Sequence, residues 1–207
     1  MKKYELTTET KLWFGRTLHR IRALVSFGDV ESGDLGGWIE TEKNLEQYGD
    51  AWVSGNARVY GDARVSGNAL VSDNALVSDN ARVYGNAQVC GDAWVYGNAQ
   101  VRGDAQVYGN AWVYGNAQVC GNAQVEKTTH YLLIGAIGSR NDTTTFFRAK
   151  DKQIFVKCGC FRGSIDDFVK AVKETHGGTK HEKTYMLAVE LAKAQIEDVE
   201  NGGMKDA

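Results

Sequence analysis

Residues 85–119 read GNAQVCGDAWVYGNAQVRGDAQVYGNAWVYGNAQV, and this stretch repeats one six-residue pattern almost without change. Alanine occupies every sixth position from Ala51 to Ala123, and valine occupies every sixth position from Val53 to Val125. The thirteen hexads follow one another without an insertion. A period of six does not match the 3.6-residue turn of an α-helix, so the pattern argues against a helical region.

Each hexad predicts a short strand followed by a corner. Ala and Val stand two residues apart, so their side chains point to the same side of an extended segment. Gly with Asn or Asp follows, and these residues tolerate the left-handed backbone of a tight corner; Asp73 and Asp79 replace Gly at two corners. Strands this short bury too little as a flat antiparallel sheet, whereas stacked coils bury every Ala and Val against neighbouring copies.

The hexads resemble the repeats of a known superfamily. The V-x-G-[ND]-A-x hexads resemble the hexapeptide repeats of left-handed parallel β-helices, a family that winds three hexads into each triangular coil. The segments Gly33–Glu40, Asn44–Leu45 and Gly49–Val53 are similar to the start of YdcK-like bacterial and prophage proteins, which are often labelled putative transferases. Two later segments, Gly138–Thr145 and Cys158–Gly163, are similar to parts of uncharacterised phage proteins. The resemblance therefore implies a bacterial or prophage origin and a β-helix fold.

We predict a mainly β chain in three parts. Residues 1–43 form an N-terminal capping segment, residues 44–126 a hexapeptide-repeat left-handed parallel β-helix with three hexads per coil, and residues 127–207 a small C-terminal α+β domain. The segment 44–50 looks like a degenerate fourteenth hexad. The cap is expected because an open solenoid end exposes a sheet edge that pairs with other chains.

The C-terminal part has its own strand and helix signals. The stretches His130–Ile137 and Thr143–Lys157 predict strands, with a hairpin tip at residues 150–152. Ser164 opens an amphipathic helix that Gly177 ends. A second amphipathic helix is expected over about residues 183–197.

The variable positions of the hexads define three outward faces. If three hexads make one coil, residues eighteen apart stack at about 4.8 Å, the spacing of paired strands. The second face is unlike the others, because it places aromatic rings in register. Its candidate interface residues are Arg58, Tyr60, Trp94, Tyr96, Trp112 and Tyr114. Three interpretations stay open: a ladder that only stabilises the coils at roughly 0.2–1 kcal/mol per pair, self-association, or binding of a foreign partner or ligand.

The resemblance also implies an enzymatic alternative. Acyltransferases of the superfamily are usually trimers that hold acyl-coenzyme A between coils and use a His as general base. The zinc-dependent carbonic anhydrases of the same fold need three His ligands. The four histidines of this chain lie outside the hexads, at His19, His130, His176 and His181. We therefore predict no catalytic residue, no metal and no cofactor, with an acyltransferase-type enzyme using acyl-coenzyme A as the alternative.

Two further candidate sites lie in the C-terminal part. Cys158 and Cys160 are expected to share a face of a strand, where His176 or His130 approaches them. The C-x-C spacing alone is a weak metal signal, so two buried thiols under a helix are the preferred interpretation. The polar loop of Ser139, Arg140 and Asn141 is a candidate anion-binding loop, with a solvated hairpin connection as the alternative.

Composition limits the class of function. The net charge is −2 with both signs spread along the chain, which argues against nucleic acid and an acidic membrane as partners. No apolar run is long enough to span a bilayer, and four cysteines do not form a disulfide framework in a chain of this size. We expect a cytoplasmic protein, in the host cytoplasm if phage-encoded. The predicted function is a non-catalytic binding or scaffold protein, a dimer or trimer that also binds a host protein or small ligand, with counter-defence as one such role.

Overall fold

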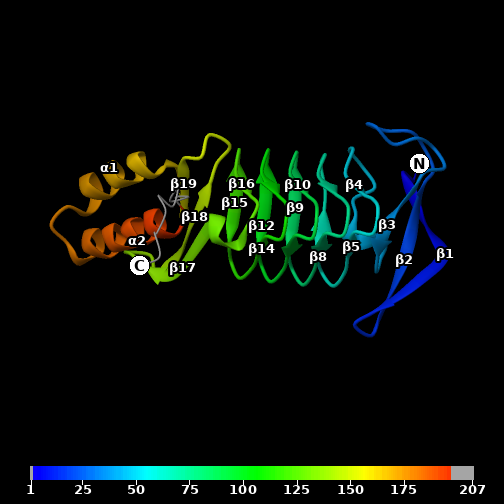
Figure 1. The fold of residues 1–207 in the computed structure, drawn as a ribbon, viewed down its shortest axis with the longest axis horizontal. Coiled ribbons are helices and arrows are strands. Elements are labelled where there is room, and N and C mark those ends of the chain that lie inside the picture. The colour runs from blue at the N-terminus through cyan, green and yellow to red at the C-terminus, as the bar shows by residue number, and fades with distance from the viewer. Residues whose placement is uncertain (1, 197–207) are drawn as a thin grey trace, which may run out of the picture. The chain divides into compact units, whose positions relative to one another are not determined.

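The computed structural model describes residues 2–196, and the chain divides into two compact units, Met1–Thr128 and Thr129–Ala207. The end of the second predicted helix, residue 197, and the rest of the predicted C-terminal domain up to residue 207 lie outside the described residues. Figure 1 shows the short strands of the first unit stacked as successive coils, with the hairpin of β1 (Tyr4–Trp13) and β2 (Arg16–Ala23) at the N-terminal end.

The hexads form a parallel β-solenoid with three sheets, as the six-residue period predicts. The first sheet contains β4 (Trp52–Val53), β7 (Leu70–Val71), β10 (Gln88–Val89), β13 (Gln106–Val107) and β16 (Gln124–Val125). The second contains, besides N-terminal strands, β5 (Arg58–Val59), β8 (Leu76–Val77), β11 (Trp94–Val95) and β14 (Trp112–Val113). The third contains β6 (Arg64–Val65), β9 (Arg82–Gly85), β12 (Gln100–Gly103) and β15 (Gln118–Gly121).

The predicted register of eighteen residues is confirmed on every face. The paired residues include Gln88 with Gln106, Trp94 with Trp112, and Gln100 with Gln118. Every inward Ala and Val of the hexads, from Ala51 to Val125, is at most 1% exposed. Each buried Val side chain contributes about 1.5–3 kcal/mol, so the interior of the coil is a continuous stabilising column.

The corners use the conformation that their residues favour. Asp73 and Asp79 have φ values of 59° and 58°, in the left-handed region that the sequence predicts for them. The Oδ2 atom of Asp73 accepts a hydrogen bond of 2.9 Å from the Gly91 N–H of the next coil. Corner amides also bond along the stack, as in the 3.1 Å contact from Asn68 Nδ2 to Asn86 Oδ1. The corners therefore link successive coils as well as turning the chain.

The N-terminal segment extends the second sheet. The strands β1 (Tyr4–Trp13), β2 (Arg16–Ala23) and β3 (Leu35–Ile39) run in the order β1-β2-β3-β5, and β3 is parallel to β5. After the short 3-10 helix η1 (Glu42–Asn44), Leu45 bridges to Val65 and occupies the position of an inward valine. Leu45 and Val53 are eight residues apart instead of six, so the turn between them holds two extra residues. The degenerate hexad at 44–50 thus continues the coil in a shifted register.

The second unit is a small α+β fold. The short 3-10 helix η2 (Thr128–His130) comes before its sheet, in which β17 (Tyr131–Ile137), β18 (Asp142–Arg148), β19 (Ile154–Cys158) and β20 (Phe161–Ser164) are antiparallel neighbours. Two helices, α1 (Ile165–His176) and α2 (Lys180–Ile196), follow. Ser164 caps α1 by accepting the Asp167 N–H, and Gly177 is its C-cap, as predicted. No helix within residues 2–196 has the length and apolar character needed to cross a membrane.

Candidate functional site

The second sheet carries a stacked aromatic surface, here called the aromatic face and made of Trp94, Tyr96, Trp112 and Tyr114. The two indole rings have centroids 5.1 Å apart and planes 9° apart. The two phenol rings have centroids 5.3 Å apart and planes 18° apart. Both stacks arise because β11 and β14 pair in parallel, so identical residues of successive coils lie one above the other.

The aromatic face is open to solvent at its C-terminal coil. Trp112 is 46% exposed and Tyr114 is 43% exposed, whereas Leu76 and Ser78 of the preceding coils are buried. A face composed of neutral rings on a rigid coil is the kind of surface that protein interfaces use. The structure therefore brings four of the six predicted interface residues together as one patch.

The other two predicted residues, Arg58 and Tyr60, lie against the N-terminal hairpin. The Arg58 guanidinium carbon is 4.0 Å from the Trp13 ring centroid, and Arg58 Nη2 donates to the Asn74 carbonyl at 3.1 Å. Burial lowers the pKa of Arg58. The Arg16 guanidinium lies 5.8 Å from the Tyr60 ring. These two side chains therefore take part in contacts within the chain, which the repeat pattern alone does not reveal.

The predicted polar loop of the second unit borders a cavity of about 430 Å³. Ser139 and Arg140 line the cavity, while Asn141, at φ 48°, is not part of its lining. The polar side chains Cys158, Cys160, His176 and Tyr185 meet there, over an apolar floor that includes Phe161, Phe168 and Val172. A few convergent polar groups above an apolar floor are typical of small-ligand sites.

Tyr185 is the most perturbed group of this cavity. Burial, followed by a contact with Cys158, raises its pKa from the ordinary 10.0 to about 12. The Cys158 thiol donates to the Tyr185 hydroxyl at 3.7 Å, and Thr144 Oγ1 donates to Cys158 Sγ at 3.1 Å. Gly138 leaves the room that this arrangement needs, because a Cβ there would lie 1.8 Å from the Tyr185 hydroxyl.

The expected placement of the two thiols is wrong. Cys158 ends β19, but Cys160 lies in the tight turn before β20 and is exposed, so the two do not share a strand face. Gly159, at φ 54°, reverses the chain between them. His176 lines the same cavity as both cysteines, whereas the buried His130 lies 3.1 Å from Arg148 and does not line it. Within residues 2–196, no three Asp, Glu, His or Cys side chains gather as a metal site.

Sequence reasoning missed a second hollow, of about 720 Å³, beside Arg64 and Arg82 on the third sheet. The register of eighteen already stacks these two arginines, and that signal was available. The wall that makes the surface concave is the turn over residues 42–48, whose path depends on the shifted register of the first coil.

Comparison with known proteins identifies the repeat. Residues 51–65, 63–79, 87–103 and 105–121 match the family model described as the YdcK Beta solenoid repeat. No curated protein matches the chain. The matched ranges all lie in the solenoid, so the comparison bears on the coil alone.

Proposed function

We propose that this chain, whose coil carries the YdcK-type solenoid repeat, is a non-catalytic binding protein whose aromatic face holds a second copy of the chain. The single observation that carries the proposal is the in-register stack of Trp94 on Trp112, with Trp112 46% exposed. A ladder that served only to stabilise the coils has no need of so much exposed indole surface, because ring-on-ring contact stabilises equally well when covered.

The chemistry of the face supports self-association over a charged partner. Its four side chains, Trp94, Tyr96, Trp112 and Tyr114, carry no formal charge at neutral pH, so two copies do not repel each other. A two-fold dimer requires a surface complementary to itself, and flat aromatic rings on parallel strands meet that requirement. The surrounding coil is rigid, so little ordering entropy is lost on association.

The oligomeric state tests this function. We expect wild-type protein to sediment at twice the chain mass or more, and Trp94→Ala with Trp112→Ala to sediment as a monomer. The matched control is Gln88→Ala with Gln106→Ala, which removes a hydrogen-bonded pair of 3.2 Å from the first face of the same two coils. Circular dichroism establishes that each variant is folded. A monomeric wild type, or equal dissociation in both double variants, would overturn the proposal.

A second candidate function is binding of a small anion in the cavity of the second unit. Arg140 supports this anion-binding function, because it lines the cavity and has no ion-pair partner within residues 2–196. Thermal shifts with inorganic phosphate, for wild type and Arg140→Gln, test this site. The same screen with acetyl-coenzyme A tests the acyltransferase alternative, for which a stabilising shift together with acetyl transfer to an amine is required. Phage origin and a host partner stay predictions from resemblance.

A further inference from the structure

The hollow on the third sheet lies at the N-terminal end of the solenoid. Its volume is about 720 Å³, within the usual range for small-molecule sites. The floor comes from β6 and β9 with Arg64, Ser66, Arg82 and Tyr84, and the wall comes from the turn over residues 42–48. It is separate from the aromatic face, which belongs to the second sheet.

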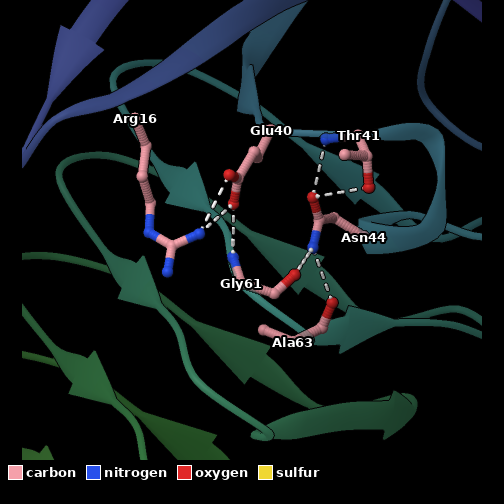
Figure 2. A network of polar contacts seen from close by, with 6 residues as sticks. All are labelled: Arg16, Glu40, Thr41, Asn44, Gly61 and Ala63. Carbon is pink, nitrogen blue, oxygen red and sulfur yellow. Dashed lines mark hydrogen bonds and ion pairs between the residues drawn. The ribbon is translucent and has the colours of Figure 1, made fainter.

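The wall is held in place by buried polar contacts. Figure 2 shows Asn44 between the turn and the coil: its amide nitrogen donates to the carbonyls of Gly61 at 3.0 Å and Ala63 at 2.9 Å, and its amide oxygen accepts the Thr41 N–H at 2.8 Å. Asn44 is fully buried. Further along the turn, the Lys3 ammonium donates to the carbonyl of Gly49 at 3.1 Å. The hollow is therefore preorganised rather than a chance gap beside a loose loop.

The two carboxylates that line the hollow interact with groups other than Arg64 and Arg82. Glu42 forms an ion pair of 2.7 Å with Lys2, and Glu46 accepts the Gly67 N–H at 3.0 Å. Glu40, close to the wall, accepts from both Arg16 and Gly61 (Figure 2). Neither Arg64 nor Arg82 has a side-chain hydrogen bond or an ion pair with any residue in the range 2–196.

The two arginines are an exception to the charge pattern of the solenoid. Arg64 and Arg82 are direct partners in the parallel pairing of β6 with β9, so their side chains leave neighbouring strands side by side. Elsewhere in the hexads no two charges of the same sign stack at this register, and the same column continues with the neutral Gln100 and Gln118. Like charges placed directly opposite destabilise a sheet. An anion between the guanidinium groups removes that repulsion.

We propose that this hollow binds the phosphate groups of a small phosphorylated molecule of nucleotide size, with Arg64 and Arg82 as the phosphate ligands. Guanidinium groups bind phosphate oxygens through paired charge-assisted hydrogen bonds, and two adjacent arginines suit a diphosphate. Tyr48, which is 77% exposed, and Tyr84 place aromatic rings in the lining, where a planar ring of the ligand can stack. The hollow is bounded and its lining holds three cations, Lys43, Arg64 and Arg82, which fits a small ligand better than a polyanion.

The first test measures the protein without ligand. Arg82→Gln removes the like-charge stack and places a glutamine over Gln100, so the variant extends a neutral column. We expect its melting temperature in low salt to equal or exceed that of the wild type, because a residue kept for binding costs stability in the empty protein. A clear loss of stability would show that Arg82 supports the fold, and it would overturn the assignment.

The second test measures binding by calorimetry with inorganic pyrophosphate, ADP and adenosine. We expect ADP and pyrophosphate to bind, adenosine not to bind, and Arg64→Gln with Arg82→Gln to weaken ADP binding at least tenfold for each lost arginine. The charge-matched control, Lys11→Gln with Lys127→Gln, removes two positive charges of the same unit outside the hollow. This control is expected to retain binding.

Three results of the binding experiment would contradict the proposal. Loss of ADP binding in Arg140→Gln but not in the Arg64 and Arg82 double variant would place the anion in the second unit and overturn the proposal. Equal weakening by both charge-matched variants would reduce the effect to general electrostatics. Tighter binding of a short single-stranded oligonucleotide than of ADP would replace the small ligand with a nucleic acid. Sedimentation of the aromatic variants is independent of all three outcomes.

Discussion

Gly138→Ala tests the geometry of the second unit most directly. Gly138 has φ 72°, and a Cβ at this position would lie 1.8 Å from the Tyr185 hydroxyl oxygen and 2.1 Å from Cζ. Tyr185 is 5% exposed and packs in the cluster that joins α1 and α2 to the sheet. Because ring carbons as well as the hydroxyl are in the way, no rotation of the O–H relieves the overlap, and the whole ring must move.

The expected cost has two parts. Alanine in the left-handed region costs about 1–2 kcal/mol. Displacing a large buried aromatic side chain costs about 3–5 kcal/mol, so the total is about 4–7 kcal/mol. A unit of about 80 residues has a free energy of unfolding of only about 4–12 kcal/mol. We therefore expect Gly138→Ala to unfold the second unit wholly or in large part.

Gly178 supplies the matched control. Its φ is 74°, nearly that of Gly138, but nothing lies within 4 Å of a Cβ built there. Gly178→Ala should therefore cost only the backbone part, about 1–2 kcal/mol. Tyr185→Leu combined with Gly138→Ala should cost less than the sum of the single variants, because leucine lacks the outer ring atoms.

Hydrogen exchange read by mass spectrometry separates the two units. Peptides from residues 131–196 should lose protection in Gly138→Ala, while hexad peptides keep theirs. If Gly138→Ala costs no more than Gly178→Ala, Tyr185 does not occupy the position described, and the account of the cavity beside it is wrong.

Two further predictions concern a corner and a titrating group. Asp73→Asn should change the free energy of unfolding by less than about 0.5 kcal/mol, whereas Asp73→Ala should cost about 2 kcal/mol. The alanine variant loses the acceptor for the Gly91 N–H and is strained at a φ of 59°. Equal urea midpoints for the two variants would contradict this prediction. The folded unit keeps Tyr185 protonated up to a pKa of about 12, while the unfolded chain ionises near 10.0, so its contribution is intact below pH 10 and falls as pH rises from 10 to 12. The stability gap between wild type and Tyr185→Phe should therefore shift by at most about 2.7 kcal/mol over that window, and a gap that does not change with pH would refute the assignment.

The solenoid follows from the sequence because its contacts repeat at a fixed spacing. Once three hexads make a coil, each residue meets the one eighteen positions away, so the Trp94–Trp112 stack and the glutamine ladder can be deduced from the printed letters. The helix from Ser164 to Gly177 is equally local, since its cap and its apolar period lie within one short segment. Nearest-neighbour contacts of this kind need no knowledge of the rest of the fold.

Only the tertiary structure decided which contacts form between segments that share no repeat. The hairpin strand that brings Trp13 onto Arg58, and the shifted first coil that closes the hollow over Arg64 and Arg82, depend on long-range packing with no period to reveal it. The same is true of the cavity where Arg140, Cys158 and Tyr185 converge from three different elements. The repeat determined the coil of this protein. The positions of its cavities depend on irregular segments, which either pack against the coil or belong to the second unit.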